Sequence, residues 1–268
     1  MNALCQMTGL NRAGFYRWRT PRQAMPVEME IRDQMQRVAL ESPAYGYRRI
    51  TAELHKRGFA VNHKRVLRMM RQDNLLCIRR RAFLVTTDSR HNLPIYPNLA
   101  RQMAPTAMNQ LWVADITYIR LHAEFVYLAV VLDAFSRRVI GWALGRTLEA
   151  ELAVMALRMA LLERKPAPGL VHHSDRGVQY ASRVYTEILQ QHQSKISMSR
   201  KSNPYDNATC ESFIKTLKYE EVYRNEYRDF QEARSCIGEF LERVYNRKRL
   251  HSALGYVPPA EFESESTS

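Results

Sequence analysis

Three acidic residues lie where folding alone would not place them. Asp115 falls inside the apolar run Leu111–Tyr118, Asp175 follows a short apolar strand that ends at His173, and Glu211 lies on an expected helix. A carboxylate inside a core-forming strand is costly unless it is paired or bound to a metal ion. One acid from a first strand, one from the end of a fourth strand and one from a later helix can converge on a single point.

Converging carboxylates suit the chemistry of phosphodiester bonds. Hydrolysis and strand transfer proceed by in-line displacement, in which two cations about 3.5–4 Å apart activate the attacking oxygen and stabilise the leaving one. Mg²⁺ prefers carboxylate oxygens and keeps several waters, so three acids suffice. We therefore expect two Mg²⁺ ions, with Mn²⁺ as a substitute, bridged by Asp115 and completed by Asp175 and Glu211.

The pattern of residues 106–262 supplies elements that can position these acids. Three strands with short turns predict an antiparallel meander, and helices then alternate with two further strands. The expected strands are 111–121, 125–133, 138–144, 170–173 and 196–198, and the expected helices are 148–162, 178–191, 207–220 and 230–246. Apolar faces are predicted on the first helix at Leu148, Leu152, Met155, Met159 and Leu162, and on the second at Tyr180, Val184 and Ile188. This order predicts an α/β fold with a ribonuclease H-like catalytic core.

Basic charge is concentrated in the N-terminal part of the chain. The net charge is +13, and residues 1–104 carry 19 Lys/Arg against 7 Asp/Glu. A basic module joined to a nearly neutral one suggests a polyanion-binding region, although a generally basic surface explains charge alone equally well.

Residues 1–92 are predicted to form an all-α helix-turn-helix DNA-binding region. Short helices are expected at Ala3–Met7 and Arg12–Trp18, and a second pair at Tyr47–Lys56 and His63–Gln72, with Asn62 as the N-cap of the last helix. On that helix Val66, Leu67 and Met70 are expected to point inward, which leaves Lys64, Arg65, Arg68 and Arg71 to contact DNA. The alternative is a small helical bundle with a solvated charged face.

The remaining segments connect or end these regions. Residues 93–105 contain three prolines without an apolar period and are read as a linker, and the polar tail 263–268 is expected to be disordered. No apolar run reaches the roughly 18 residues of a membrane span, and no secretory signal is evident. We therefore expect a cytoplasmic protein without a membrane partner.

The motifs together resemble a known family. The acids Asp175 and Glu211 are separated by 35 residues and Lys218 follows, which resembles the DD(35)E signature of retroviral integrases and insertion-sequence transposases. The segments LWVADITYI, VVLDAFSRRVIGWAL, HHSDRGVQY and SMSRKSNPYDNATCESFIKTLKYE are similar to the second-frame transposases of two-reading-frame bacterial insertion sequences, and a basic YGYRRI precedes them.

The resemblance implies end cleavage and strand transfer of an insertion sequence by a DDE transposase. Asp115, Asp175 and Glu211 would be its catalytic metal ligands, while Lys218, Lys215 and Asn207 would contact DNA near the site. It implies terminal inverted repeats and target DNA as partners, a homo-oligomer in a synaptic complex, an upstream-frame product or fusion partner, and a location at the bacterial nucleoid.

Two other functions fit the sequence. The basic N-terminal region and the lack of a heptad zipper fit a DNA-binding regulator with little activity of its own. The three acids alone also fit a ribonuclease H-like nuclease that only hydrolyses.

Several polar residues have competing interpretations. Asp133 is expected to cap a turn. Of His172 and His173, one is expected to pack in the sheet and the other to lie near Asp175 without binding a metal ion, because imidazole suits zinc better than Mg²⁺. His55 and His63 lack the CxxC of an integrase zinc module, so no zinc is expected. Residues 247–249 would either contact DNA or end a helix in solvent.

Overall fold

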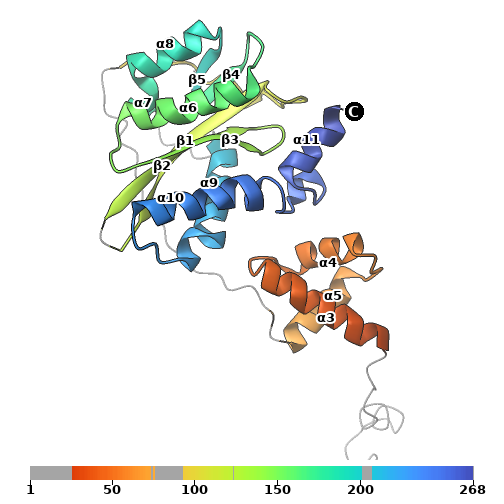
Figure 1. Cartoon of the computed structure of the whole chain (residues 1–268). Coiled ribbons are helices and arrows are strands. Elements are labelled where there is room, and N and C mark those ends of the chain that lie inside the picture. Colours follow the sequence, from red (N-terminus) through yellow and green to blue (C-terminus); the bar gives the residue numbers. More distant parts are fainter. Residues whose placement is uncertain (1–25, 74, 76–92, 123, 201–206, 268) are drawn as a thin grey trace, which may run out of the picture. The chain divides into compact units, whose positions relative to one another are not determined.

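The chain divides into two compact units, Met1–Cys77 and Ile78–Ser268 (Figure 1). The computed structural model describes residues 26–73, 75, 93–122, 124–200 and 207–267. None of the helices in these ranges is both long and apolar enough to cross a membrane. The predicted helices Ala3–Met7 and Arg12–Trp18 lie outside the described residues.

The first unit contains three described helices. They are α3 (Pro26–Glu41), α4 (Tyr47–Lys56) and α5 (His63–Gln72). The predicted bounds of α4 and α5 are confirmed, and the Asn62 side chain accepts a hydrogen bond from the Lys64 amide at 2.8 Å, as expected of an N-cap. Helix α3 was not predicted, although Ile31, Met35 and Val38 follow helical spacing and are buried.

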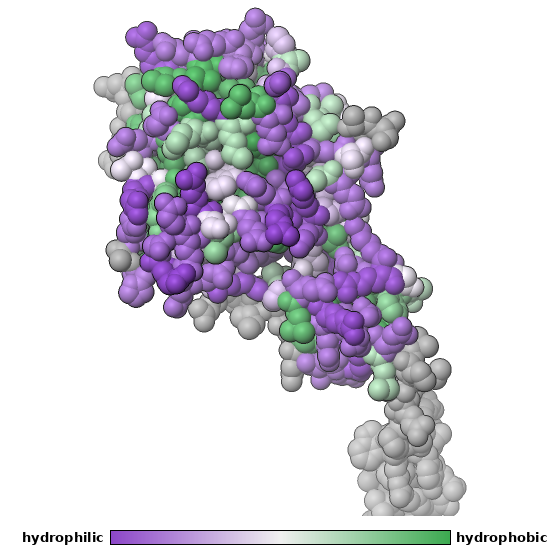
Figure 2. Space-filling view, in the orientation of Figure 1, coloured by the Kyte–Doolittle hydropathy of each residue, from purple (hydrophilic) through white to green (hydrophobic). Residues whose placement is uncertain are grey.

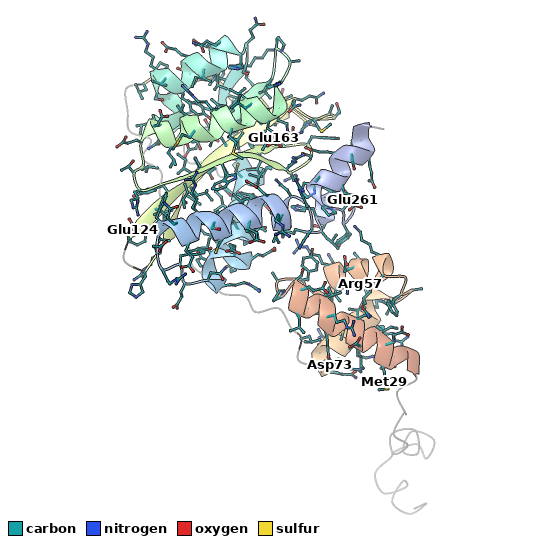
Figure 3. All side chains as sticks on the ribbon, in the orientation of Figure 1. Met29, Arg57, Asp73, Glu124, Glu163 and Glu261 are labelled. Atoms are coloured by element: carbon teal, nitrogen blue, oxygen red, sulfur yellow. The ribbon has the colours of Figure 1, made fainter. Side chains whose placement is uncertain are left out.

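The core of the first unit differs in one position from the prediction. Val66 and Met70 of α5 are buried as expected, but Met69 is fully buried and Leu67 is only half buried. Ion pairs brace the outside of the unit: Arg57 contacts Glu41 at 2.6 Å, and Arg32 contacts Asp73. Figure 3 labels Arg57 and Asp73, one member of each pair.

A five-stranded mixed sheet forms the centre of the second unit. Its strands are β1 (Leu111–Arg120), β2 (Phe125–Asp133), β3 (Val139–Gly145), β4 (Val171–Ser174) and β5 (Lys195–Met198), in the order β3-β2-β1-β4-β5. Strands β1 to β3 are antiparallel, whereas β4 pairs in parallel with both β1 and β5. The five predicted strands and their ribonuclease H-like order are confirmed.

Helices cover both faces of this sheet (Figure 1). One face carries α6 (Ala150–Arg164), α7 (Val178–Ala181) and α8 (Arg183–Gln191), and the other carries α9 (Ala208–Glu220) and α10 (Phe230–Glu239), which continues as a π-helix at Phe240–Tyr245. Short 3-10 turns lie at Ala100–Gln102, Val222–Arg224 and Ser252–Leu254, and α11 spans Pro259–Thr267. Each side of the sheet has its own buried cluster, because alternate strand residues face opposite sides.

The predicted inner face of α6 is confirmed at Leu152 and wrong at Met155 and Leu162. Met155 is 44% and Leu162 is 75% exposed, whereas Ala153, Ala156 and Ala160 are buried. The helix lies very close to β3, because a Cβ built on Gly141 would stand 2.2 Å from the Ala156 carbonyl oxygen. The face of α6 that packs on the sheet is therefore the one with small side chains. Its larger apolar side chains contribute to the hydrophobic surface that Figure 2 shows over α6.

The helix predicted over 178–191 is two helices. Ser182 interrupts it and caps α8 by accepting a hydrogen bond from the Tyr185 amide. Because of this interruption, the residues of α8 face the core differently from those of one continuous helix. Val184, predicted to be buried, is 51% exposed, and Tyr185 and Leu189 are buried instead.

Both segments predicted to be loosely held pack on the second unit. The amides of Leu99 and Ala100, in the predicted linker 93–105, donate hydrogen bonds to Ser197 Oγ at 2.8 and 3.3 Å. The division between the units therefore falls earlier in the chain than the predicted linker.

The prediction of a disordered tail is wrong for residues 263–267, which belong to α11. Glu263 is buried, accepts a hydrogen bond from Ser136 at 2.6 Å and pairs with Arg138 and Arg164. Burial would raise the pKa of Glu263, but hydrogen bonds from Arg164 and Ser136 hold it below its usual value. A polar tail sequence thus docks through one buried acid.

Candidate active site

The pairing of β1 with β4 brings two of the acids together. These strands run parallel, with Leu111 opposite Val171, Trp112 opposite His172 and Val113 opposite His173. Continuing this register by two residues sets Asp175, just past the end of β4, opposite Asp115. Asp115 also shares a strand face with Val113, which belongs to the cluster beneath α9.

Backbone amides orient both aspartates. Asp115 Oδ1 accepts from the Ile116 amide at 2.8 Å, and Asp175 Oδ1 accepts from the Gly177 amide at 2.8 Å. Gly177 also allows close approach, since a Cβ there would lie 3.0 Å from Asp175 Oδ1. Gly177, two residues after Asp175 in HHSDRG, is therefore a sequence signal for this site, and the predictions above did not use it.

Helix α9 carries the third acid along the same face of the sheet. Cys210, Phe213 and Leu217 are buried in the cluster that contains Val113, which fixes the helix on β1. Glu211 is adjacent to this buried face and is exposed. Within the described chain its carboxylate makes no hydrogen bond or ion pair, so its side chain can turn toward the two aspartates.

Asn207 ties the start of α9 to the strand of Asp115. Its Nδ2 donates a hydrogen bond to the Ala114 carbonyl at 3.1 Å, and the side chain is buried, with 7% exposure. Its Oδ1 is also buried and has no hydrogen-bond partner among the described residues. This hydrogen bond ties the start of α9 to β1, and the expected DNA contact of Asn207 stays a prediction. The neighbouring loop 203–206 lies outside the described residues.

The electrostatics of Asp115 connect the acids to one another. Desolvation raises the pKa of Asp115 to about 8, and the charges of Asp175 and Glu211 add to the rise, while the Ile116 hydrogen bond and the charge of Lys218 oppose it. Desolvation also raises the pKa of Glu211. A buried carboxylate beside two like charges favours a positive ion.

The acids are neighbours without forming a closed ligand set. Across the described ranges, no three Asp, Glu, His or Cys side chains are gathered closely enough to hold a metal ion. The donor chemistry nevertheless fits a hard cation, because all three groups are carboxylates and Glu211 is not engaged elsewhere.

The two candidate lysines differ in their surroundings. Lys218 is half buried and its Nζ lies 4.4 Å from the centroid of the Tyr118 ring, whereas Lys215 is exposed. Desolvation lowers the pKa of Lys218 and the charge of Asp115 counteracts this. With Asn207 beside Ala114 and Lys218 beside Tyr118, α9 runs along β1 in the same direction.

Both histidines beside Asp175 are buried in the sheet, whereas only one of them was predicted to pack there. His172 Nε2 hydrogen-bonds the Tyr185 hydroxyl at 2.9 Å, and both ring nitrogens of His173 hydrogen-bond serines, Ser197 and Ser199. Desolvation lowers the pKa of His172 to about 3, so its ring is neutral.

Two other polar residues are also accounted for. Asp133 caps its turn as predicted, accepting from the amides of Phe135 and Ser136. Arg249 is buried against Glu220 at 2.7 Å, so neither DNA contact nor a solvated helix end describes it.

Both units correspond to known domain families. The chain matches the integrase core domain family over residues 105–204 and 192–259, and the HTH-like domain family over residues 26–83. It is 40% identical to the insertion element IS600 uncharacterized 31 kDa protein of Shigella sonnei, over 98% of either chain. It is 35% identical to transposase InsF for insertion sequence IS3A of Escherichia coli K12, over 99% of this chain and 94% of that one.

The chain therefore belongs to the IS3-type insertion-sequence transposases, and its reaction class is polynucleotidyl transfer in DNA transposition. The fold agrees: a chain of the simian T-cell lymphotropic virus intasome, solved with PP2A regulatory subunit B56 gamma, superposes with a TM-score of 0.50 at 16% identity. That match covers 86% of this chain and 74% of the other. The predicted family and fold class are confirmed.

Removing the Asn207 amide should impair the site more than the fold. We expect Asn207→Ala to raise the Mg²⁺ concentration for half-maximal strand transfer several-fold, because α9 and Glu211 are less firmly held. The loss of a buried hydrogen bond should also lower the free energy of unfolding by about 1–3 kcal/mol.

Asn246 provides the matched control, because its buried amide bonds the Val139 backbone at 2.8 and 3.0 Å. Asn246→Ala should lose similar stability with an unchanged Mg²⁺ requirement. Equal Mg²⁺ curves for the two variants would contradict a positioning role for Asn207.

Proposed function

We propose that the chain nicks the ends of its insertion sequence and joins the freed 3′-hydroxyl to DNA, with Asp115, Asp175 and Glu211 as ligands of two divalent ions. The observation that carries this proposal is the placement of three carboxylates where β1, β4 and α9 meet: Asp115 on β1, Asp175 just past the end of β4, and Glu211 on α9. The alternative is that Asp115 is a structural acid, buried in an ion pair with a cationic side chain. The neighbouring charges that change the pKa of Asp115 most are those of acids, which does not fit this alternative.

The ligand set suits Mg²⁺, with Mn²⁺ as a substitute, because every donor is a carboxylate oxygen. When bound, the ions would supply activation of the attacking oxygen and stabilisation of the leaving oxygen. Asp115 would hold the ions together with Asp175 and Glu211, since its charge interacts with the charges of both carboxylates.

The remaining residues of the site would bind and orient the DNA. Lys218 is close enough to Asp115 for their charges to interact, so its ammonium would hold a phosphate beside the reacting one. Lys215 lies three residues earlier on α9 and is exposed, which suits a second phosphate contact.

Replacing one ligand should abolish both chemical steps. We expect Asp115→Asn to lower nicking and strand transfer by about 1,000-fold, because metal stabilisation of the transition state is worth several kcal/mol. The assay is incubation of the full chain with end-containing DNA and Mg²⁺, followed by separation of nicked and joined products.

Asp229→Asn is the control, because Asp229 caps α10 and asparagine caps equally well. It should retain both products, and Asp115→Asn should retain DNA binding. Full strand transfer by Asp115→Asn would refute the ligand assignment, and nicked products without joined ones from the unaltered chain would identify a nuclease.

The first unit would hold DNA through α5. Lys64, Arg68 and Arg71 are exposed on this helix, as a groove-facing helix requires. Arg65 is less available, because it pairs with Glu28 at 3.2 Å. We therefore assign the phosphate contacts to the three exposed residues and give Arg65 the lesser share.

The salt dependence of DNA binding tests this assignment. Replacing Lys64, Arg68 and Arg71 by Gln should reduce the slope of log affinity against log salt by up to about 2.7, or about 0.9 for each lost phosphate contact.

A control with the same loss of charge replaces Arg37, Arg183 and Arg243, which are exposed and lie on other helices. This control should leave the slope close to its original value. Equal slopes for both triple variants would show that α5 does not contact the DNA phosphates.

A second copy of the chain would cover the hydrophobic surface over α6. Met155 and Leu162 are exposed there, and Glu151 and Arg158 flank Met155 without ion pairs among the described residues. Two α6 helices packed antiparallel about Met155 would set Glu151 of one copy beside Arg158 of the other. Such a self-complementary patch fits a two-fold oligomer that holds two DNA ends.

A charge in this surface should weaken self-association. We expect Leu162→Glu to shift the mass measured by light scattering toward the monomer, because burying an unpaired carboxylate in an interface is costly. Leu40→Glu is the control, since Leu40 is 80% exposed on α3. An unchanged mass for Leu162→Glu would rule out this face.

A further inference from the structure

Four aromatic side chains gather where β1 and β2 approach the end of α9. Tyr118 contacts Phe125 with ring centroids 6.0 Å apart, and Tyr219 contacts Tyr223 at 5.7 Å, both in edge-to-face geometry. Burial raises the pKa of Tyr223, and the neighbouring Tyr118 and Tyr219 add to the rise, which links the two pairs. We call these four residues the aromatic cluster.

The aromatic cluster is open to solvent. Phe125 is 54% exposed and Tyr223 is 44% exposed, whereas Phe213 and Tyr245, which form a similar edge-to-face pair, are buried in the core. Single exposed apolar side chains are common, but contiguous rings at a surface mark a binding site.

Positive charge surrounds these rings. Lys218 Nζ lies over the Tyr118 ring, Arg224 is exposed and its Nε donates to the Tyr219 carbonyl at 3.0 Å, and the exposed Arg120 pairs with Phe125 in the strand register. Rings that can stack on bases, interleaved with cations that can hold phosphates, are the features of a single-strand binding surface.

Two of the nearby acids already have partners. Glu220 pairs with Arg249, and Glu221 accepts hydrogen bonds from Asn225 and Tyr227. The positive charge of Lys218, Arg224 and Arg120 is thus not consumed by these two carboxylates.

The aromatic cluster adjoins the candidate active site. Tyr118 follows Asp115 by three residues on β1, which corresponds to about 10 Å along the strand and to the alternate face of it. Lys218 connects the two places, because it interacts with the charge of Asp115 and contacts the Tyr118 ring. Strand β4 ends at Ser174, so among the described strands the later part of β1 pairs with β2 alone.

We propose that the aromatic cluster binds unpaired bases of the DNA strand that leads away from the reacting phosphate. Phe125 and Tyr223 stack on the bases, while Lys218 and Arg224 hold the phosphates between them. This proposal rests on the proposed strand-transfer function. It adds that the DNA bound by the protein is unpaired next to the cleaved bond.

The test uses the full chain and a single-stranded oligothymidine that carries one fluorescent adenine analogue, whose emission falls when it stacks on an aromatic ring. A duplex of equal length is the second probe, and both are measured in EDTA so that no chemistry is needed. We expect Tyr223→Leu and Phe125→Leu each to weaken single-strand binding about tenfold and to reduce the quenching, with duplex affinity unchanged.

The conservative variant separates stacking from simple hydrophobic contact. Tyr223→Phe keeps the ring and should bind and quench as the unaltered chain does, whereas Tyr223→Leu keeps only the apolar bulk. Unchanged single-strand binding by both leucine variants, equal losses for single strand and duplex, or equal losses for Tyr223→Phe and Tyr223→Leu would overturn the proposal. Because binding is measured without metal, failure of this proposal can be distinguished from failure of the ligand assignment, which is tested by the activity of Asp115→Asn.

Discussion

The parallel pairing of β1 with β4 is the constraint on which the candidate site depends. It brings Asp175, just past the end of β4, to the part of β1 that carries Asp115, and α9 is fixed over β1 by Cys210, Phe213 and Leu217. Because side chains alternate along a strand, a shift of one residue in this register would turn Asp115 to the opposite face, away from α9. The hydrophobic cluster therefore does more than stabilise the unit, since it determines which side of the sheet carries the acids.

This placement concentrates negative charge in a desolvated region. The pKa of Asp115 rises to about 8 because burial and two neighbouring carboxylates all disfavour its charged form. The protein retains an arrangement that is unfavourable for folding, which is expected when a cation or a charged transition state offsets the cost. The half-buried Lys218 opposes the effect only in part, so it remains suited to a phosphate.

The sequence predicted elements whose local pattern is strong and missed those that depend on tertiary packing. Strand β2 and helices α4 and α5 were predicted to the residue, because continuous apolar runs and capping residues mark them. The acids stood out because an aspartate inside an apolar strand has no folding rationale. The buried face of α6 was missed because it depends on a tertiary contact: Gly141 of β3 lets the helix approach so closely that its alanines pack against the strand. The roles of Asn207 and Glu263 depend on partners far away in sequence.

Iron-directed cleavage of the polypeptide would test the convergence of the three acids most directly. Fe²⁺ replaces Mg²⁺ at oxygen sites and, with ascorbate and peroxide, cuts the backbone next to where it is bound. The account predicts cuts near Asp115, Asp175 and Glu211 together, all suppressed by excess Mg²⁺ and by Asp115→Asn. Cuts near only one of these segments, or a pattern that Asp115→Asn leaves unchanged, would contradict a shared metal site.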